Sequence, residues 1–371
     1  MRKALIAVIG ICAVASVAAQ QKPSVAARQK PKAPATTPAV ARTADGHPDF
    51  TGMYDLATMT PVERLPGVKD LVLPKEQADA AEKYEAERNV QDDKPLKGDR
   101  DAPPAGGERP QAKSYLEVLE FAGGGVVGGY NRFWLAEGNK LATVEGQKRS
   151  SIVIDPPDGH IPPTNEIGRK RNARYLAGAV SPDAAESASS GPPGAFDGPE
   201  LRPLAERCLM GFNSTAGPPA LPNYFYNNLH QIVQTRDTVM ILTEMVHDAR
   251  VVRMNQPHLP PAIRKWMGDS VGHWEGDTLV IDTTNFTGKT QFRGSSDKLH
   301  VVERISRMAD GNLVYRFTVE DPDTWDRPWT GEYPWVVTHE TLYEYACAEG
   351  NYALEDMLRG ARLAEAEKAK Q

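Results

Sequence analysis

Short runs of alternating apolar and polar residues, joined by tight turns, fill the second half of the chain. The turns fall at Arg236-Asp237, at Glu275-Gly276-Asp277 and at Asp310-Gly311-Asn312. Asp-Gly and Gly-Asp steps between such runs are strong hairpin signals, because glycine and aspartate tolerate the backbone angles of a tight turn. Consecutive hairpins build a meander. The sequence therefore predicts a mainly β protein, an antiparallel meander that forms a lipocalin-like barrel or a sandwich.

Helical and loop patterns are expected only around this meander. Helical patterns occur at 75–90, 165–178 and 354–370. Stretches rich in proline and glycine indicate long surface loops at 99–110, 155–163 and 187–200. The prediction is thus a β-rich body with a few peripheral helices and long Pro/Gly loops.

The N-terminus has the form of a signal peptide. Two basic residues precede an apolar run of secretory length, and small residues lead up to Ala19. The run is too short for a permanent membrane span, so we expect a periplasmic or secreted protein with no transmembrane segment in the mature chain. The expected organisation is a signal peptide at 1–19, a disordered basic tether rich in proline and alanine at 20–43, a single β-rich domain at 44–362 and a charged C-terminal tail at 363–371.

The charge of the chain is divided unevenly. Residues 1–42 carry seven basic and no acidic side chains, and the whole chain has a net charge of −6, so the remainder carries −13. An acidic body argues against a nucleic-acid partner, since phosphate binding requires basic surfaces. The expected partner is a small molecule, and the sequence does not indicate an oligomeric state.

The sequence has three cysteines, and two of them remain in the mature chain because Cys12 lies in the expected signal peptide. Two cysteines in an exported protein usually pair, since the compartment is oxidising. A disulfide between Cys208 and Cys347 is therefore expected, with two separately buried thiols as the alternative.

Glu303 is a carboxylate on an apolar strand face. Alternate side chains of a strand share a face, and from Leu299 to Ile305 the other members of that face are apolar. A carboxylate buried there needs a partner. Glu303 is either a general base whose pKa is raised by its apolar neighbours, or one half of a structural ion pair with Arg250 or Arg293.

The stretch EMVHDARVVRMNQPH, residues 244–258, is unusually polar for a strand. As one extended strand it places Glu244, Asp248 and Arg250 on one face and His247 on the other. The first interpretation is a ladder of salt bridges. The second is an acid–base set, in which Glu303 is the base, His247 or Asp248 is the partner acid and Arg250 stabilises an anion.

The sequence has no HExxH motif and no Cys/His cluster. We therefore predict no cofactor and no metal site. The alternative is a metal ion held by His247, His258 and a carboxylate, which only tertiary folding would bring together.

Aromatic residues gather late in the chain, where Trp325 and Trp329 either rim a pocket at the mouth of the barrel or pack over the core. The expected binding residues are Glu244, Asn285, Arg293, Trp325 and Trp329. The expected function is an exported protein with a pocket for a small, partly apolar molecule. Such a protein is either a cofactor-free hydrolase, lyase or isomerase that uses acid–base carboxylates, or a non-catalytic periplasmic binding protein.

Several long blocks resemble a large family of exported bacterial proteins, most of them uncharacterised. The blocks include HPDFTGMY, DPPDGHIPP, EMVHDARVV, GDSVGHWEGDTLVIDTTNF, TVEDPDTWDRPW and YEYACAEGNY, and the resemblance extends from about Asp45 to Arg362. It implies that Cys208 and Cys347 belong to the family pattern, and it places Glu303 and Arg250 inside family blocks. The resemblance implies an organisation and no particular reaction.

Overall fold

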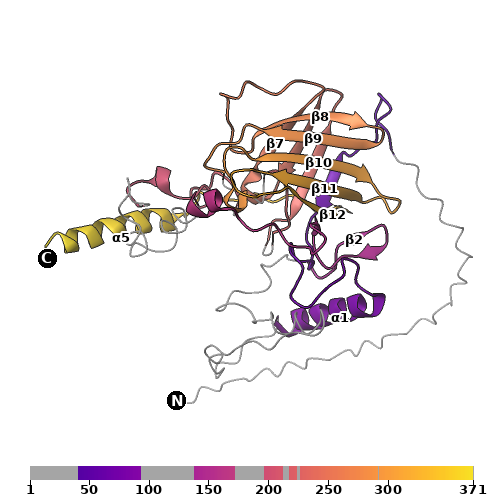
Figure 1. The fold of residues 1–371 in the computed structure, drawn as a ribbon, viewed down its shortest axis with the longest axis horizontal. Coiled ribbons are helices and arrows are strands. Elements are labelled where there is room, and N and C mark those ends of the chain that lie inside the picture. Colours follow the sequence, from indigo (N-terminus) through magenta and orange to yellow (C-terminus); the bar gives the residue numbers. More distant parts are fainter. Residues whose placement is uncertain are drawn as a thin grey trace, which may run out of the picture. The chain divides into compact units, whose positions relative to one another are not determined.

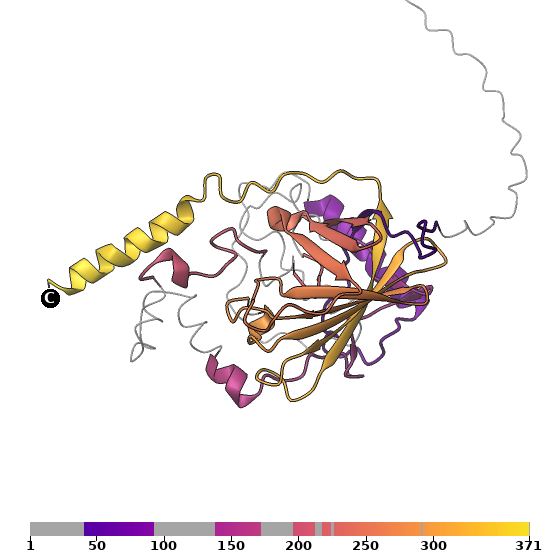
Figure 2. The same cartoon turned by 90° about the horizontal axis from the view of Figure 1, so that it is seen from above.

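Nine strands close into a barrel in the computed structural model, which describes residues 41–92, 138–171, 196–211, 217–223, 226–290 and 292–370 (Figures 1 and 2). In their order around the barrel the strands are β1 (Gly52–Asp55), β5 (Leu229–Gln234), β6 (Thr238–Thr243), β7 (Ala249–Met254), β8 (Asp269–Glu275), β9 (Thr278–Thr284), β10 (His300–Arg307), β11 (Leu313–Glu320) and β12 (Trp329–Thr338). Pairing of β12 with β1 closes the ring. The predicted mainly β barrel is confirmed.

The predicted hairpins are present, but the barrel is not a pure antiparallel meander. The β5–β6, β8–β9 and β10–β11 pairs are antiparallel hairpins, and Gly311 at the last turn has φ +93°. In contrast, β7 and β8 pair in parallel. A parallel pair needs a crossover connection, and residues 255–268 supply it. The barrel is therefore mixed.

The strand expected to run through residues 238–254 is broken. It ends at Thr243 and resumes antiparallel to itself at Ala249. The 3-10 turn η5 (Met245–His247) lies between, with left-handed backbone angles at Val246 (φ 61°) and His247 (φ 47°). The prediction that Glu244, Asp248 and Arg250 share one strand face is therefore wrong, because the turn reverses the chain between them.

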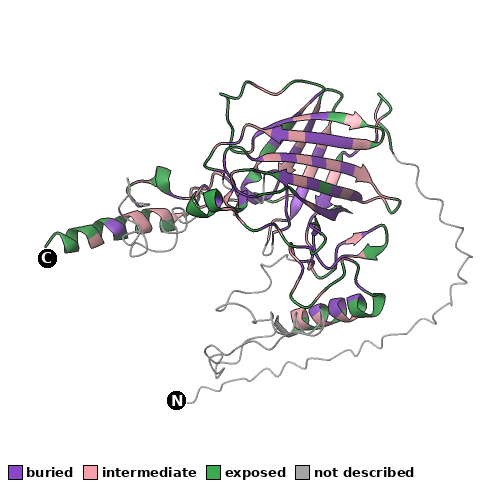
Figure 3. Cartoon of the chain, viewed as in Figure 1, coloured by how far each residue is buried: buried purple, intermediate pink, exposed green. Residues whose placement is uncertain are grey.

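Large aromatic side chains fill the barrel. Buried residues alternate with less buried ones along β6, β10 and β11, and Figure 3 shows this banding on β10 and β11. The largest buried rings of β11 and β12 are Tyr315, Phe317, Trp329, Tyr333 and Trp335. Gly331 lies opposite Phe317, and a Cβ atom at Gly331 would come within 2.3 Å of that ring. Glycine is required there because the ring occupies the space of its side chain.

The two ends of the barrel are closed by different segments. At the end where β5 meets β6, Phe50 packs near Trp274, and Arg307 donates a hydrogen bond to the carbonyl of Asp49 at 2.6 Å. We call this the Phe50 end. The opposite end, at the β6–β7 turn, is crossed by residues 217–223, and we call it the Ala220 end.

The remaining elements are shorter strands, turns and helices outside the ring of nine strands. They are α1 (Lys75–Asp92), the hairpin of β2 (Thr143–Val144) and β3 (Gln147–Lys148), β4 (Val153–Asp155), which pairs with β12, the 3-10 turns η3 (Pro199–Leu201) and η6 (Phe292–Gly294), and α5 (Tyr352–Lys368). The helices expected at 75–90 and near the C-terminus are present, and α5 continues past Arg362 into the expected tail. A helix covers 166–171, and the rest of the expected 165–178 lies outside the described residues.

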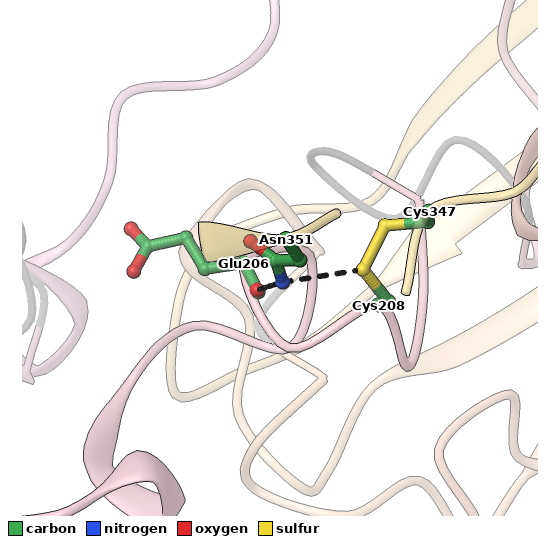
Figure 4. The surroundings of a disulfide bond; sticks show 4 residues. All are labelled: Glu206, Cys208, Cys347 and Asn351. Atoms are coloured by element: carbon green, nitrogen blue, oxygen red, sulfur yellow. Dashed lines mark hydrogen bonds between the residues drawn. A yellow bond between two sulfur atoms is a disulfide. The ribbon is translucent and has the colours of Figure 1, made fainter. Parts of the chain in front are cut away.

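Cys208 and Cys347 form the predicted disulfide, with an S–S distance of 2.06 Å (Figure 4). The amide nitrogen of Asn351 donates to the carbonyl of Glu206 at 2.9 Å and reaches the Cys208 sulfur at 3.5 Å. The bond therefore joins the chain just before α5 to the segment near residue 206. The expected signal peptide at 1–19 and the tether from 20 to 40 lie outside the described residues. In the part of the chain that the structure describes, no helix has the length and apolar character needed to cross a membrane.

Candidate functional site

Glu303 and Arg250 form an ion pair inside the barrel. The side chain of Glu303 is 0% exposed and that of Arg250 is 6% exposed. One guanidinium nitrogen lies 2.8 Å from Oε1 of Glu303, and the other donates to Oε2. The two strands, β7 and β10, are separated by β8 and β9, so the pair crosses the interior. The structure thus places Arg250, rather than Arg293, beside Glu303.

Two tyrosines, Tyr315 and Tyr333, form hydrogen bonds with Ala220, in the segment that closes the Ala220 end, and Tyr315 also bonds to Glu303. Tyr315 donates its hydroxyl hydrogen to Oε1 of Glu303 at 2.7 Å, and its oxygen accepts the Ala220 amide at 2.9 Å. Tyr333 donates to the carbonyl of Ala220 at 3.0 Å. Burial raises the pKa of both tyrosines well above the ordinary value, and the charge of Glu303 adds to the effect. Both hydroxyls therefore remain protonated donors.

His230 lies in the same interior and is only 2% exposed. Its Nδ1 lies 3.3 Å from the carbonyl of Asn228, which can only accept, so Nδ1 carries the hydrogen. Burial lowers the pKa of His230 to about 4, and the positive charge of Arg250 acts in the same direction. The ring is therefore neutral and its Nε2 is an acceptor. That atom is buried and has no hydrogen-bond partner among the described residues.

The β6–β7 turn holds the other predicted acid–base residues. His247 is exposed at the surface. Asp248 has one carboxylate oxygen, Oδ2, that is buried without a hydrogen-bond partner in the described chain. Burial raises the pKa of Asp248 to about 6, although a positive charge on His247 would lower it. The structure thus brings Glu303 and Arg250 together and places His247 on the outside of the turn.

The predicted binding residues are mainly structural in this arrangement. Glu244 is buried and accepts the Tyr343 amide at 3.1 Å, and Asn285 donates to the Leu259 carbonyl at 2.9 Å. Arg293 lies in η6 with a left-handed φ of 46°. Trp325 and Trp329 are buried with ring centroids 6.0 Å apart. Both belong to the main hydrophobic core, which favours the interpretation that they pack over the core.

A second polar cluster lies on the outer face of the barrel. Nδ1 of His258 is 3.2 Å from Asp269, and its Nε2 is 2.9 Å from Asp282. The other oxygen of Asp282 is 3.0 Å from Nε2 of His300, whose Nδ1 lies 3.6 Å from Glu320. Carboxylates and imidazoles therefore alternate from β8 to β11. A neutral imidazole has one N–H, so His258 donates to both carboxylates only when it is protonated.

The pKa values in this outer cluster follow from its contacts. Burial acts to raise the pKa of Asp269, but hydrogen bonds from the Leu259 amide, Lys265 and His258 outweigh it and the pKa is lowered. The hydrogen bond to Asp282 raises the pKa of His300, against the effect of burial. Because His258 belongs to the crossover loop 255–268, the cluster fixes that loop to the sheet.

Sequence reasoning missed both histidine arrangements. His230 shares its strand face with Ile232, a buried residue, and this parity is a readable signal of an inward side chain. The outer cluster depends on the crossover loop and has no local signal. Within the described residues, no group of three or more His, Cys, Asp or Glu side chains is arranged to hold a metal ion.

A groove of about 710 Å³ lies outside the barrel interior. Its lining includes Met53 of β1, Gln231 of β5 and the chain from Val337 to Leu342. Comparisons with protein-family models, with curated proteins and with solved structures give no match. The function must therefore be inferred from the site itself.

Proposed function

We propose that the protein binds a small, partly apolar molecule at the Ala220 end of the barrel. The observation that supports this most directly is the buried Nε2 of His230, an acceptor without a partner among the described residues. A buried polar atom that lacks a hydrogen bond costs about 1–3 kcal/mol. A ligand that donates a hydrogen bond to Nε2 would remove this cost, and the aromatic rings around it would hold the apolar part of that ligand.

The buried ion pair supports the same location. Apolar residues of similar volume often give equal or greater stability than a buried pair such as Arg250 and Glu303. Folding alone therefore does not account for two charges inside a barrel that is otherwise lined with large apolar rings. Placed beside His230, the pair offers a charged partner to the polar group of a ligand.

Acid–base catalysis is the second candidate, and the position of Tyr315 favours it. Its protonated hydroxyl joins Glu303 at 2.7 Å, so a proton donor and a carboxylate already share a hydrogen bond. In this version the protein is a cofactor-free hydrolase, lyase or isomerase, in which Glu303 takes a proton and Arg250 stabilises an anion. The structure gives His247 no contact with this set, so the partner acid in this proposal is Tyr315.

We further infer that the protein is exported and belongs to the bacterial family that it resembles. The disulfide of Cys208 and Cys347 supports export, because such bonds persist in oxidising compartments. The signal-peptide pattern of residues 1–19 supports it from the sequence.

Native mass spectrometry of the mature chain purified from a periplasm tests the binding proposal. We expect a bound organic molecule on the wild-type chain. It should be lost from His230→Phe, which keeps an aromatic ring and removes Nε2. It should be retained by the control His160→Phe, whose histidine is exposed. A wild-type chain with no bound molecule, or equal retention by His230→Phe, would contradict the proposal.

Addition of candidate substrates then separates the two versions of the function. An enzyme requires that Glu303→Gln, assayed at a temperature at which this destabilised variant is still folded, binds substrate but turns it over more slowly. A binding protein shows no turnover in either form.

A further inference from the structure

Residues 217–223, with the sequence GPPALPN, cross the Ala220 end in an arrangement that resembles a bound peptide. Residues 217–222 are all buried, and Ala220 and Leu221 belong to the main hydrophobic core. Three of the seven residues are prolines, which have no N–H and cannot donate to a β-ladder. This segment therefore enters the barrel without becoming one of its strands.

Two side chains recognise the backbone of one residue in this segment. Tyr315 accepts the N–H of Ala220 at 2.9 Å, and Tyr333 donates to the C=O of the same residue at 3.0 Å. A neighbouring strand would satisfy an extended residue with the same pair of hydrogen bonds, but here both come from side chains. Tyr315 and Tyr333 lie directly opposite each other on β11 and β12, so they form a fixed acceptor and donor.

The two tyrosines that bind Ala220 belong to a group of packed aromatic rings. Tyr315 packs edge-to-face against Tyr333, with ring centroids 5.6 Å apart, and stacks on Trp335 at 4.8 Å. Aromatic surfaces bind proline-rich segments well, because the proline rings are rigid and lose little entropy when they are ordered.

We propose that residues 217–223 are an intrachain ligand, which occupies a recognition site for a short proline-containing peptide and leaves the site when such a peptide binds. This inference rests on the proposed function and names the class of molecule that the site accepts. The recognised unit is one small residue, preceded by proline, whose own N–H and C=O are both hydrogen-bonded by tyrosine side chains. The segment itself then keeps the site closed in the absence of that peptide.

Hydrogen exchange on the wild-type chain tests whether the segment opens independently of the barrel. The Ala220 amide should exchange through local opening, at least about ten-fold faster than the amides of Glu303 and Tyr315 in the barrel strands. Equal exchange at all three amides would overturn the proposal, because the segment would then open only when the whole barrel unfolds.

Peptide binding tests the recognition. The probe is the synthetic peptide Ac-GPPALPN-NH2, and its matched control carries an N-methylated alanine that cannot donate to Tyr315. In Ala220→Pro the chain's own donor to Tyr315 is missing, so this variant should bind the probe at least about ten-fold more tightly than the wild type does. The N-methylated peptide should bind about five-fold more weakly than the probe. Equal binding of the two peptides, or no binding by a folded variant, would overturn the inference.

If Ala220→Pro does not fold, hydrogen exchange on the wild-type chain still tests the peptide inference. Its Ala220 amide should exchange faster as the probe concentration rises, and the N-methylated peptide should have a smaller effect at each concentration. An exchange rate that is independent of the probe would overturn the inference.

The two proposals fail in different ways. A bound non-peptide molecule that His230→Phe loses, together with an Ala220 amide that exchanges only by global unfolding, would leave the proposed function standing and remove the peptide inference. Specific binding of the probe, with no molecule on the purified chain and no effect of His230→Phe on the binding, would leave the peptide inference standing and remove the role proposed for His230.

Discussion

Replacement of Glu303 by glutamine should destabilise the protein strongly. Glu303 is 0% exposed and both of its oxygens accept hydrogen bonds from Arg250, so the glutamine would leave the guanidinium charge buried without a counter-charge. Removal of one member of a buried pair typically costs about 3–5 kcal/mol. We expect a loss near 3 kcal/mol, because the amide oxygen still accepts from Arg250. That is a large part of the roughly 5–15 kcal/mol by which domains are stable.

Urea unfolding at pH 7, followed by the fluorescence of the buried tryptophans, measures this loss. The double variant Arg250→Met/Glu303→Leu removes both charges, so its free energy of unfolding should be within about 1 kcal/mol of the wild type or higher. Glu275→Gln makes the same chemical change in a surface pair with Arg304 and should have no measurable effect. A stable single variant, or a double variant as unstable as the sum of its single variants, would refute the reasoning.

Three further predictions concern pH and the disulfide. Folding raises the pKa of Asp248 from 3.8 to about 6, so the free energy of unfolding falls as the pH rises through this window. Asp248→Asn should therefore raise the free energy of unfolding at pH 7.5 by about 1–2 kcal/mol, a value reduced to allow for the partial exposure of Asp248. The same variant should have no such effect below pH 4. Asp282 raises the pKa of His300, so the contribution of His300 to stability is complete below its ordinary pKa of 6.5 and is lost as the pH rises through its pKa in the folded state. The melting temperature of His300→Gln should therefore lie further below that of the wild type at pH 5.5 than at pH 9. Cys208→Ser opens a link between residues 139 positions apart, and in a urea titration it should lower the free energy of unfolding by about 2–5 kcal/mol, with no further loss when Cys347→Ser is added.

The parts of the fold that were predicted correctly carry their signal within a few residues. The β8–β9 and β10–β11 hairpins turn at Gly276 and Gly311, and glycine next to aspartate in the sequence predicts the left-handed φ values found there. The β6–β7 turn has no such signal, because Val246 is β-branched and rarely adopts a left-handed angle. The parallel β7–β8 pair and the closure of β12 onto β1 join distant segments, so local patterns cannot specify them.

The candidate site was predictable to the extent that it depends on strand alternation. Strand alternation places Glu303 on an apolar face, where a buried carboxylate needs a partner. The sequence offers Arg250 and Arg293 as the two candidates. The choice between Arg250 and Arg293 needed the barrel, because strands β7 and β10 face each other only across a closed interior. His230 was within reach of the same reasoning. The outer polar cluster from Asp269 to Glu320 could not be predicted in this way, because His258 joins it only through the crossover loop.

Several costs of this fold lie at the Ala220 end. Val246 holds a backbone conformation that costs about 1–3 kcal/mol, and the unpaired Nε2 of His230 adds a comparable amount. Buried ion pairs such as that of Arg250 and Glu303 often give no more stability than apolar residues of similar volume. At the Phe50 end, Phe50 packs against Trp274, and the buried Nε of Arg307 also has no hydrogen-bond partner among the described residues. Local rules of folding are broken mainly at functional sites, where another gain offsets the cost. These costs support the proposals that a ligand binds at the Ala220 end and that it displaces the segment through Ala220.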